Sequence, residues 1–336
     1  MNWREIWIDP KTNRLRCGWR VLIFLPLAVL FWGMLSYLYI DTVDRYLHVA
    51  KPFQFYVQLL AVDAIGAFVF ISLGILALRV FEHLPAQTLG LPLRGTWLQT
   101  IAIGFVLGIG LITILAFALR MTGFATFTWH HPGSHALTML GVAVLGALIV
   151  GLMEETVFRG YLFQTLLRGI GPIATLGITS ALFACMHLGN DNITLLGLAN
   201  IFLAGVMLGM LYLRIGTLWL PIGLHAGWNF GQLLFGLPIS GEKIPLTTPF
   251  TGVLHGATWL TGGNFGLEGG VGASILMLAV IAIVTYSRRG LPLESQWWEW
   301  RELIPSATPS LPWDLTVDTR YYQWKLLEHE TGNEEQ

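Results

Sequence analysis

The chain contains a series of apolar runs, each close to the length of a membrane-spanning helix. A helix needs about 20 mostly apolar residues to cross the hydrocarbon core of a bilayer. Eight runs come near that length and carry no central formal charge. This pattern predicts a protein that crosses a membrane several times. The runs are 21–40, 56–78, 98–119, 136–153, 172–188, 194–213, 216–236 and 271–286.

Composition agrees with lipid as the solvent. The 336 residues are 54% hydrophobic and 12% charged, whereas soluble domains carry about 25% charged residues. The net charge is −1 and no basic run is present, so we expect no nucleic-acid partner. Two cysteines, Cys17 and Cys185, fit neither a disulfide framework nor a Cys-rich metal site. Membrane lipid is therefore the first expected partner.

The fold class follows from backbone hydrogen bonding in lipid. Every N–H and C=O needs a partner there, which leaves helices or closed barrels, and the runs lack the alternation of barrel strands. Placing both termini in the cytoplasm puts most Lys and Arg near span ends on the inner side. We predict an all-α polytopic bundle of about eight transmembrane helices in a cell membrane, most simply a bacterial inner or plasma membrane. The inner set is Arg4, Lys11, Arg14, Arg16, Arg20, Arg79, Arg94, Arg168, Arg214, Arg288 and Arg289; the outer set is Arg45, Lys51, Arg120 and Lys243.

Four segments describe the expected organisation. Residues 1–20 form a cytoplasmic N-terminal segment, and 21–135 hold the first transmembrane helices. Residues 136–289 form a transmembrane core that contains most of the polar residues at membrane depth. The tail 290–336 is acidic, and we expect it in the cytoplasm, with Trp297, Trp298 and Trp300 suited to a short interfacial segment.

Ionisable residues inside the predicted spans are the main candidates for function, because each costs about 2.5–3.5 kcal/mol at a helix centre. Few residues qualify. Asp63 is one, and we expect it either to pair within the bundle or to line a water-filled cavity that leads to the site. The others are Glu154, Glu155 and Arg159, then His187, then His225 with Asn229.

Helical geometry predicts different roles for Glu154 and Glu155. Glu155 and Arg159 are four residues apart, so they can form an ion pair on one helix face. Adjacent residues point about 100° apart on a helix, which leaves Glu154 without a local partner. A poorly solvated carboxylate of this kind suits a general base or acid. The alternative is a helix end whose charges are solvated among cytoplasmic headgroups.

Two further pairs share the four-residue spacing. Phe183 and His187 lie on one face of the fifth run, and His225 and Asn229 lie on one face of the seventh. An imidazole beside an amide supplies a tunable group and a non-titrating hydrogen-bond donor. The alternative for each pair is packing, as hydrogen-bonding groups between membrane helices.

Together, one carboxylate, two imidazoles and one amide suit hydrolysis through an activated water and a stabilised oxyanion. The chain has no Gly-x-Ser-x-Gly turn and no His-Glu-x-x-His helix. Cys185 is two residues before His187 and so lies near the opposite helix face, which disfavours a cysteine nucleophile. We expect His130, His131 and His135 to be solvated loop residues.

In this order, the three motifs resemble the CAAX protease and bacteriocin-processing family of intramembrane proteases, which includes the type II CAAX prenyl endopeptidases. The resemblance is strong over 136–229 and extends to 89–91. The stretches 202–205 and 211–219 are similar to the family's approach to its last His motif, and 262–268 is similar to a loop found in many bacterial members. The resemblance does not extend to the tail, residues 290–336.

The resemblance implies a role for each motif residue. Glu154 would act as the base and polarise a water together with His187, while His225 and Asn229 would stabilise the oxyanion of a peptide bond. Glu155, Arg159 and Phe183 would be supporting residues. A zinc ion (Zn2+) held by His187, His225 and Glu154 would have acceptable ligand types, although the spacing does not require one. We expect a metal-free reaction.

The implied substrate is a membrane-anchored peptide or protein; a prenylated or CAAX-like C-terminus is carried over from distant relatives alone. The main alternative is a non-catalytic membrane scaffold or a bacteriocin-immunity or regulatory protein. A transporter that uses Asp63 is a third hypothesis. It is disfavoured because matched Gly/Pro-broken helices in two halves are missing from the sequence.

Overall fold

The computed structural model describes residues 3–10, 14–46, 51–93, 95–130, 133, 136–244 and 248–286. The acidic tail, which includes Trp297, Trp298 and Trp300, lies outside these ranges, as do His131 and His135. Helices form most of the described chain, and the predicted all-α polytopic membrane bundle is confirmed. The longer helices are α2 (Cys17–Tyr46), α3 (Lys51–Ala77), α4 (Trp97–Met121), α5 (Ala136–Arg159), α6 (Tyr161–Ile170), α7 (Pro172–Met186), α8 (Leu195–Ile215), α9 (Trp219–Leu234) and α11 (Val271–Tyr286).

Short elements complete the fold. They are the helices α1 (Trp3–Trp7) and α10 (Thr258–Thr261), the π-helical turn η1 (Leu78–Glu82), the 3-10 turns η2 (Ala86–Leu89), η3 (Gly263–Phe265) and η4 (Leu267–Gly269), and the strands β1 (Ile8–Asp9), β2 (Arg14–Leu15), β3 (Ala125–Trp129) and β4 (Phe250–Leu254). Strands β3 and β4 pair antiparallel, from Ala125 opposite Leu254 to Trp129 opposite Phe250. The sequence did not predict this pairing of distant segments.

Each predicted apolar run is helical, but the helices differ in length. In the described ranges, five segments are long and apolar enough to span a membrane: α2, α3 with η1, α4, α5 with α6, and α8. Helices α7, α9 and α11 have 15, 16 and 16 residues. That corresponds to roughly 23 Å at 1.5 Å per residue, less than the ~30 Å hydrocarbon core. Within the described ranges, five of the eight predicted runs are therefore long enough to span by length and composition, and the other three form shorter helices packed among them. The cytoplasmic placement of both termini stays a prediction.

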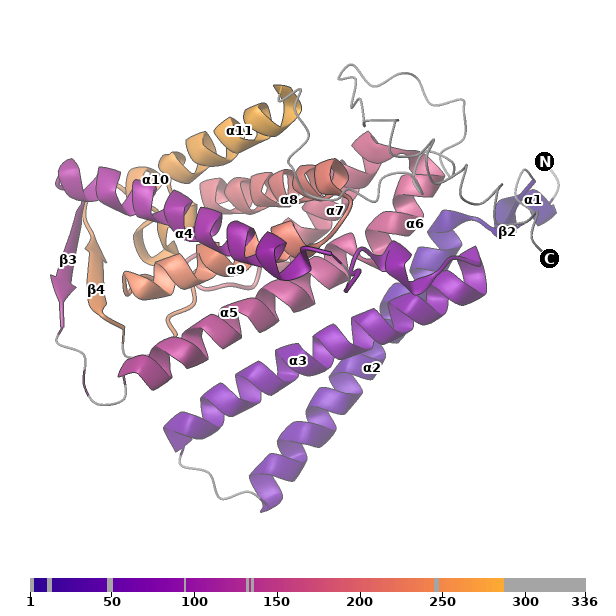
Figure 1. Ribbon diagram of the computed structural model, residues 1–336, viewed down its shortest axis with the longest axis horizontal. Coiled ribbons are helices and arrows are strands. Elements are labelled where there is room, and N and C mark those ends of the chain that lie inside the picture. Colours follow the sequence, from indigo (N-terminus) through magenta and orange to yellow (C-terminus); the bar gives the residue numbers. More distant parts are fainter. Residues whose placement is uncertain are drawn as a thin grey trace.

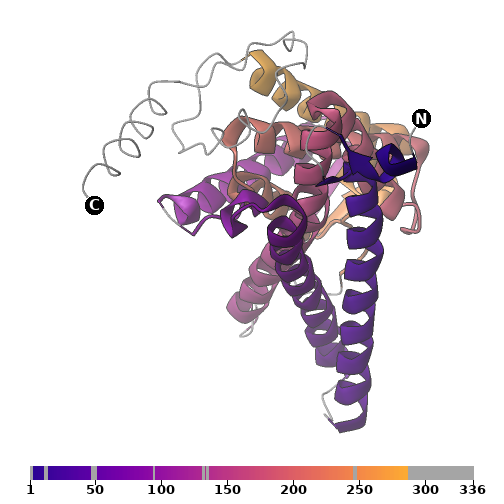
Figure 2. The same cartoon turned by 90° about the vertical axis from the view of Figure 1, so that its right-hand side faces the viewer.

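Helix α5 lies at the centre of the bundle (Figure 1). It packs against α3 on one side and α9 on the other, and α9 in turn packs against α4 and α8. Helices α2 and α3 form a long hairpin whose far end projects beyond the other helices (Figure 2). Helix α11 covers the outer side of α8. The short helix α9, which carries His225 and Asn229, is thus surrounded by protein.

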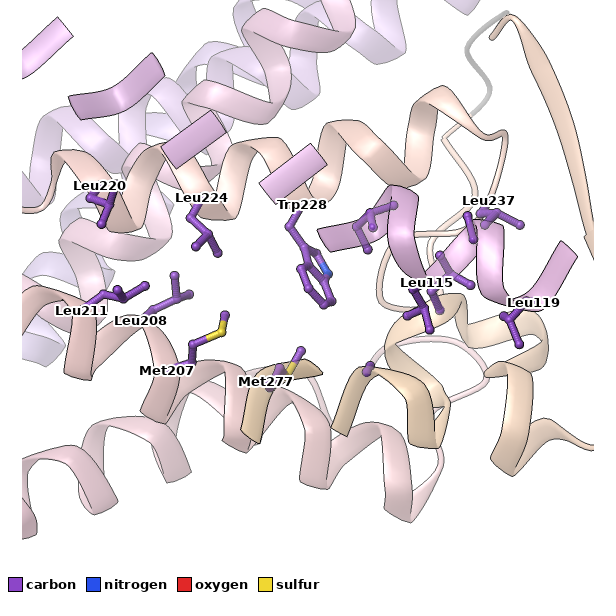
Figure 3. Close-up of a cluster of buried hydrophobic side chains, with 14 of the residues drawn as sticks. Leu115, Leu119, Met207, Leu208, Leu211, Leu220, Leu224, Trp228, Leu237 and Met277 are labelled. Carbon is purple, nitrogen blue, oxygen red and sulfur yellow. The ribbon is translucent and has the colours of Figure 1, made fainter. Parts of the chain in front are cut away.

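A buried apolar cluster packs α9 against the neighbouring helices. Leu220, Leu224 and Trp228 of α9 face Met207, Leu208 and Leu211 of α8, with Leu115 of α4 and Met277 of α11 in the same cluster (Figure 3). Without a hydrophobic driving force in lipid, such contacts stabilise mainly through close packing. The cluster therefore sets the position of the α9 face that holds the polar pair.

Glycines let α4 and α9 approach closely. Gly104 and Gly108 of α4 face Gly223 and Gly227 of α9, at the four-residue spacing of small residues typical of membrane helix pairs. A Cβ at Gly108 would lie 2.3 Å from the Leu224 carbonyl oxygen, and one at Gly227 would lie 2.0 Å from that of Phe105. A side chain at either position would force the helices apart.

We therefore expect Gly227→Ala to destabilise the protein by about 1–3 kcal/mol through overpacking. Gly110→Ala is the matched control, because a Cβ there meets no atom within 4 Å and Ala favours helix over Gly. Unfolding in detergent, followed by circular dichroism, measures both changes. Equal stability of the two variants would contradict the close α4–α9 contact.

The end of the bundle near the start of α2 contains a buried charge cluster that the sequence did not reveal. The carboxylate of Glu82, which is 3% exposed, forms an ion pair with Arg20, lies 3.5 Å from Arg168 Nε and accepts a 3.1 Å hydrogen bond from Thr165. Arg14 donates to the Glu82 carbonyl oxygen at 2.7 Å. Three arginines predicted as inner-side loop charges thus converge on one π-helical turn and tie α2, α3 and α6 together.

Candidate active site

A cavity of about 290 Å³ lies between α3, α5, α7, α8 and α9. Its lining includes all four predicted catalytic residues, Glu154, His187, His225 and Asn229, together with Phe183. These residues come from three helices and the turn after one of them, so tertiary packing brings the three sequence motifs to one place.

Helix α5 continues past the glutamates instead of ending among headgroups. Glu155 and Arg159 are both 0% exposed, and the chain bends at Gly160 before α6 begins. A Cβ at Gly160 would lie 2.3 Å from the Thr156 carbonyl oxygen, so the bend depends on glycine. The alternative of a solvated helix end is therefore wrong for this pair.

Glu155 and Arg159 form the buried centre of a network. Arg159 Nη1 donates to Glu155 Oε1 at 2.8 Å, and Nη2 donates to the Gly205 carbonyl oxygen of α8 at 3.1 Å. The guanidinium carbon lies 4.7 Å from the ring centre of Phe183 on α7, a cation–π arrangement. One arginine therefore connects α5, α7 and α8 behind the cavity.

His225 connects this network to the cavity. Its Nδ1 lies 3.0 Å from Glu155 Oε1, and its Nε2 lies 3.6 Å from Glu154 Oε2. A carboxylate oxygen accepts, so we assign the Nδ1 proton as the donor to Glu155. This bond orients the ring and turns Nε2 toward Glu154, the arrangement by which a supporting carboxylate positions a functional imidazole.

His187 lies at the C-terminal end of α7, not inside a helix as predicted, because α7 ends at Met186. Its Nδ1 is 2.8 Å from the Phe183 carbonyl oxygen. Since a carbonyl accepts, Nδ1 carries the proton, and Nε2 is left as an acceptor in the neutral ring. The Phe183 ring lies 4.8 Å from the His187 ring and 6.1 Å from the His225 ring, between centroids.

Asn229 and Glu154 line the cavity with polar atoms that make no hydrogen bond within the described ranges. Asn229 is 8% exposed, and within the described ranges its side-chain amide makes no hydrogen bond. Glu154 has a 21% exposed side chain, yet its Oε2 is buried and has no hydrogen-bond partner there. Both side chains line the cavity, where a bound reactant would meet them.

Glu268 is a buried carboxylate at the cavity that the motifs did not single out. It accepts hydrogen bonds from Trp228 Nε1 at 2.8 Å, Gln232 Nε2 at 3.0 Å, and the backbone N and Oγ of Ser240 at 2.8 and 2.5 Å. These bonds tie η4 to α9 beside His225 and Asn229. The sequence held two signals. The stretch 262–268, similar to a loop of bacterial family members, ends at Glu268, and Trp228 lies between the two motif residues, where a buried indole N–H needs an acceptor.

The zinc hypothesis requires at least three potential ligand side chains close together. Across the part of the chain that the structure describes, no three His, Cys, Asp or Glu side chains gather in a way that could hold a metal ion. His187, His225 and Glu154 share the cavity but do not form such a cluster, so this arrangement does not fit the zinc set.

Part of the chain matches a known protein family. Residues 136–231 match the family model described as type II CAAX prenyl endopeptidase Rce1-like. This stretch, called the Rce1-like segment below, is similar to that family. The resemblance inferred from the three motifs is confirmed for this segment, which contains all seven predicted site residues and supports a CAAX-type protease at the level of the family.

One curated relative is an uncharacterised 24.3 kDa protein of Escherichia coli, which is 37% identical to this chain over 102 residues. The match covers 30% of this chain and 44% of the relative, so the chain spans less than half of that protein's length. Asp63 and Glu268, which also line the cavity, lie outside the Rce1-like segment.

Proposed function

We propose that the protein is an intramembrane endopeptidase in which Glu154 activates a water to hydrolyse a peptide bond. The observation that carries the proposal is the buried Oε2 of Glu154, without a hydrogen-bond partner in the described ranges and 3.6 Å from His225 Nε2 in a cavity of the Rce1-like segment. A carboxylate left free beside an oriented imidazole is what proton abstraction from water requires.

The reaction uses the four cavity residues in turn. Glu154 takes a proton from water, which His187 Nε2 orients as an acceptor, and the water oxygen attacks the carbonyl carbon. The resulting oxyanion accepts hydrogen bonds from the Asn229 amide and from Nε2–H of His225, whose ring takes up a second proton from solvent before the attack. The C–N bond then breaks as Glu154 passes its proton to the leaving amine. Glu155 and Arg159 hold His225 in place.

The substrate class follows from the rest of the lining. Between α3 and α5 the cavity wall is apolar, which suits an apolar or lipid-modified segment more than a soluble peptide. We infer a membrane-anchored peptide or protein in the bacterial inner or plasma membrane, with a prenylated or CAAX-like C-terminus as one such class. The apolar wall residues include Leu59, Leu60, Ala143, Gly146, Ala147 and Val150.

Asn229→Ala tests the oxyanion role. In liposomes that contain the full chain and membrane-anchored peptides, we expect kcat to fall about 10²–10³-fold with little change in KM, because the lost donor acts on charge that develops in the transition state. New peptide ends and incorporation of labelled oxygen from water report hydrolysis. Asn264→Ala is the control, since Asn264 is exposed and does not line the cavity. Full activity of Asn229→Ala would contradict the assigned role.

The scaffold or immunity alternative has support from the Arg159 network, which ties three helices together. It predicts that wild-type protein cleaves no peptide in this assay, and that the cellular phenotype depends on Arg159 but not on Glu154. Hydrolysis that depends on Glu154 excludes it.

A further inference from the structure

Asp63 of α3 is a buried carboxylate that the proposed reaction does not use. It is 9% exposed and lines the cavity. Within the described ranges it makes no hydrogen bond or ion pair. Burying a polar group without a partner costs free energy, and α3 lies outside the Rce1-like segment. This residue therefore requires an explanation of its own.

The packing of α3 on α5 places Asp63 relative to Glu154. A Cβ at Gly146 would lie 3.0 Å from Leu60, and one at Gly66 would lie 2.9 Å from Met153. Residue numbers thus rise together along the two helices, which lie side by side in Figure 1. Asp63 lies between these two levels, about one helical turn before Glu154, which is roughly 5–6 Å along the helix axis.

The cavity is electronegative at this point. Four carboxylates line it, those of Asp63, Glu154, Glu242 and Glu268, whereas the described lining contains no Lys or Arg. Glu268 is satisfied by its four hydrogen bonds, and Glu242 is exposed to solvent. Glu154 faces His225 Nε2 at 3.6 Å, so within the described ranges Asp63 is the buried carboxylate of the lining that has no partner. A carboxylate in a cavity without Lys or Arg attracts a cation and rejects an anion.

We propose that Asp63 binds a basic side chain of the peptide substrate and so determines specificity for Lys or Arg near the scissile bond. This inference rests on the proposed function. An extended peptide rises about 3.3 Å per residue, so one helical turn corresponds to about two residues. The basic residue therefore lies within about two residues of the bond that faces Glu154, and the apolar wall beyond Asp63 contacts its apolar neighbours.

The experiment compares membrane-anchored peptides that carry either Lys or norleucine, a neutral side chain of similar length. The substitution is made at each of three positions on either side of the scissile bond, with the full chain in liposomes. At one position we expect wild-type kcat/KM to favour Lys by about tenfold or more, the usual size of a charge-assisted hydrogen bond. The ratio of the two peptides is the readout.

The variants separate binding from packing. Asp63→Asn is expected to bring the Lys-to-norleucine ratio close to one, Asp63→Glu to retain the preference, and Asp63→Lys to favour Glu at the same position. Glu242→Gln is the matched control, because its exposed carboxylate at the cavity is screened by solvent, and it should keep the wild-type ratio. A purely structural role for Asp63 would change both peptides equally.

Several results would overturn the inference. Equal cleavage of Lys and norleucine peptides by wild-type protein at every position removes it but leaves the proposed function intact. An unchanged ratio in Asp63→Asn, with an altered unfolding temperature, makes Asp63 a packing residue. If folded wild-type protein cleaves neither peptide, the proposed function fails. Binding of the same peptides with an N-methylated scissile amide then decides the question, and equal affinities reject a cation site at Asp63.

Discussion

Replacing Glu154 with Gln is expected to lower kcat/KM for a membrane-anchored peptide by about 10²–10⁴-fold, the range that a positioned general base contributes. Gln has nearly the same shape as Glu but cannot accept the proton of the attacking water. Because Glu154 Oε2 has no hydrogen-bond partner in the described ranges, we expect the unfolding temperature to change little. Cleavage rates and unfolding, measured on the same preparation in liposomes and detergent, test both expectations.

Glu242→Gln is the matched control for Glu154→Gln. It removes one carboxylate from the same cavity at an exposed position, so a general effect of charge on substrate capture would appear in both variants. Activity retained by Glu154→Gln would exclude this residue as the base. An equal loss in both variants would instead assign the effect to the field of the cavity.

The second large effect is expected for Arg159→Leu, which leaves the carboxylate of Glu155 buried without its main partner. Removing one member of a buried ion pair costs about 3–5 kcal/mol, because an uncompensated charge stays in a low-dielectric interior. Both side chains are 0% exposed, and Arg159 also donates to the Gly205 carbonyl oxygen. Chemical unfolding in mixed detergent micelles measures the loss.

Arg45→Leu is the control for Arg159→Leu. Arg45 forms an ion pair with Asp41 at the same four-residue spacing and the same 2.8 Å distance, but the side chain of Arg45 is 64% exposed. Exposed pairs of this kind contribute about 0–1 kcal/mol, so Arg45→Leu should cost much less than Arg159→Leu, which also loses the bond to Gly205 and the contact with Phe183. The double variant Glu155→Gln with Arg159→Leu should recover part of the loss. If the single and double variants unfold alike, the unpaired charge is not the cause.

Local spacing made several features predictable. An i,i+4 relation depends only on the helical period, so Glu155 with Arg159 and Phe183 with His187 could be paired before the structure was known. Apolar run length likewise located the five segments of the described chain that are long enough to span a membrane, because that length depends on the helical rise. The order of three motifs along the chain then led to the resemblance that the Rce1-like match over residues 136–231 confirms.

Features that depend on distant segments were not predictable from one sequence. The helical pattern does not indicate that Arg14, Arg20 and Arg168 converge on Glu82. It also does not indicate that β3 pairs with β4. Helix lengths were overestimated where an apolar run continued past its helix, as at His187, which follows the end of α7. Hydropathy reports the solvent around a residue and not its backbone conformation.

Sequence alone determined that this chain folds as helices in lipid, and which few polar residues at depth could perform chemistry. That follows from the cost of burying charge in hydrocarbon, which makes each retained ionisable group informative. Tertiary structure alone decided that Glu154, His187, His225 and Asn229 line one cavity, that Glu155 serves His225 as well as Arg159, and that Asp63 faces the same space. Those relations depend on how helices far apart in the chain pack, and helical periodicity contains no information about that packing.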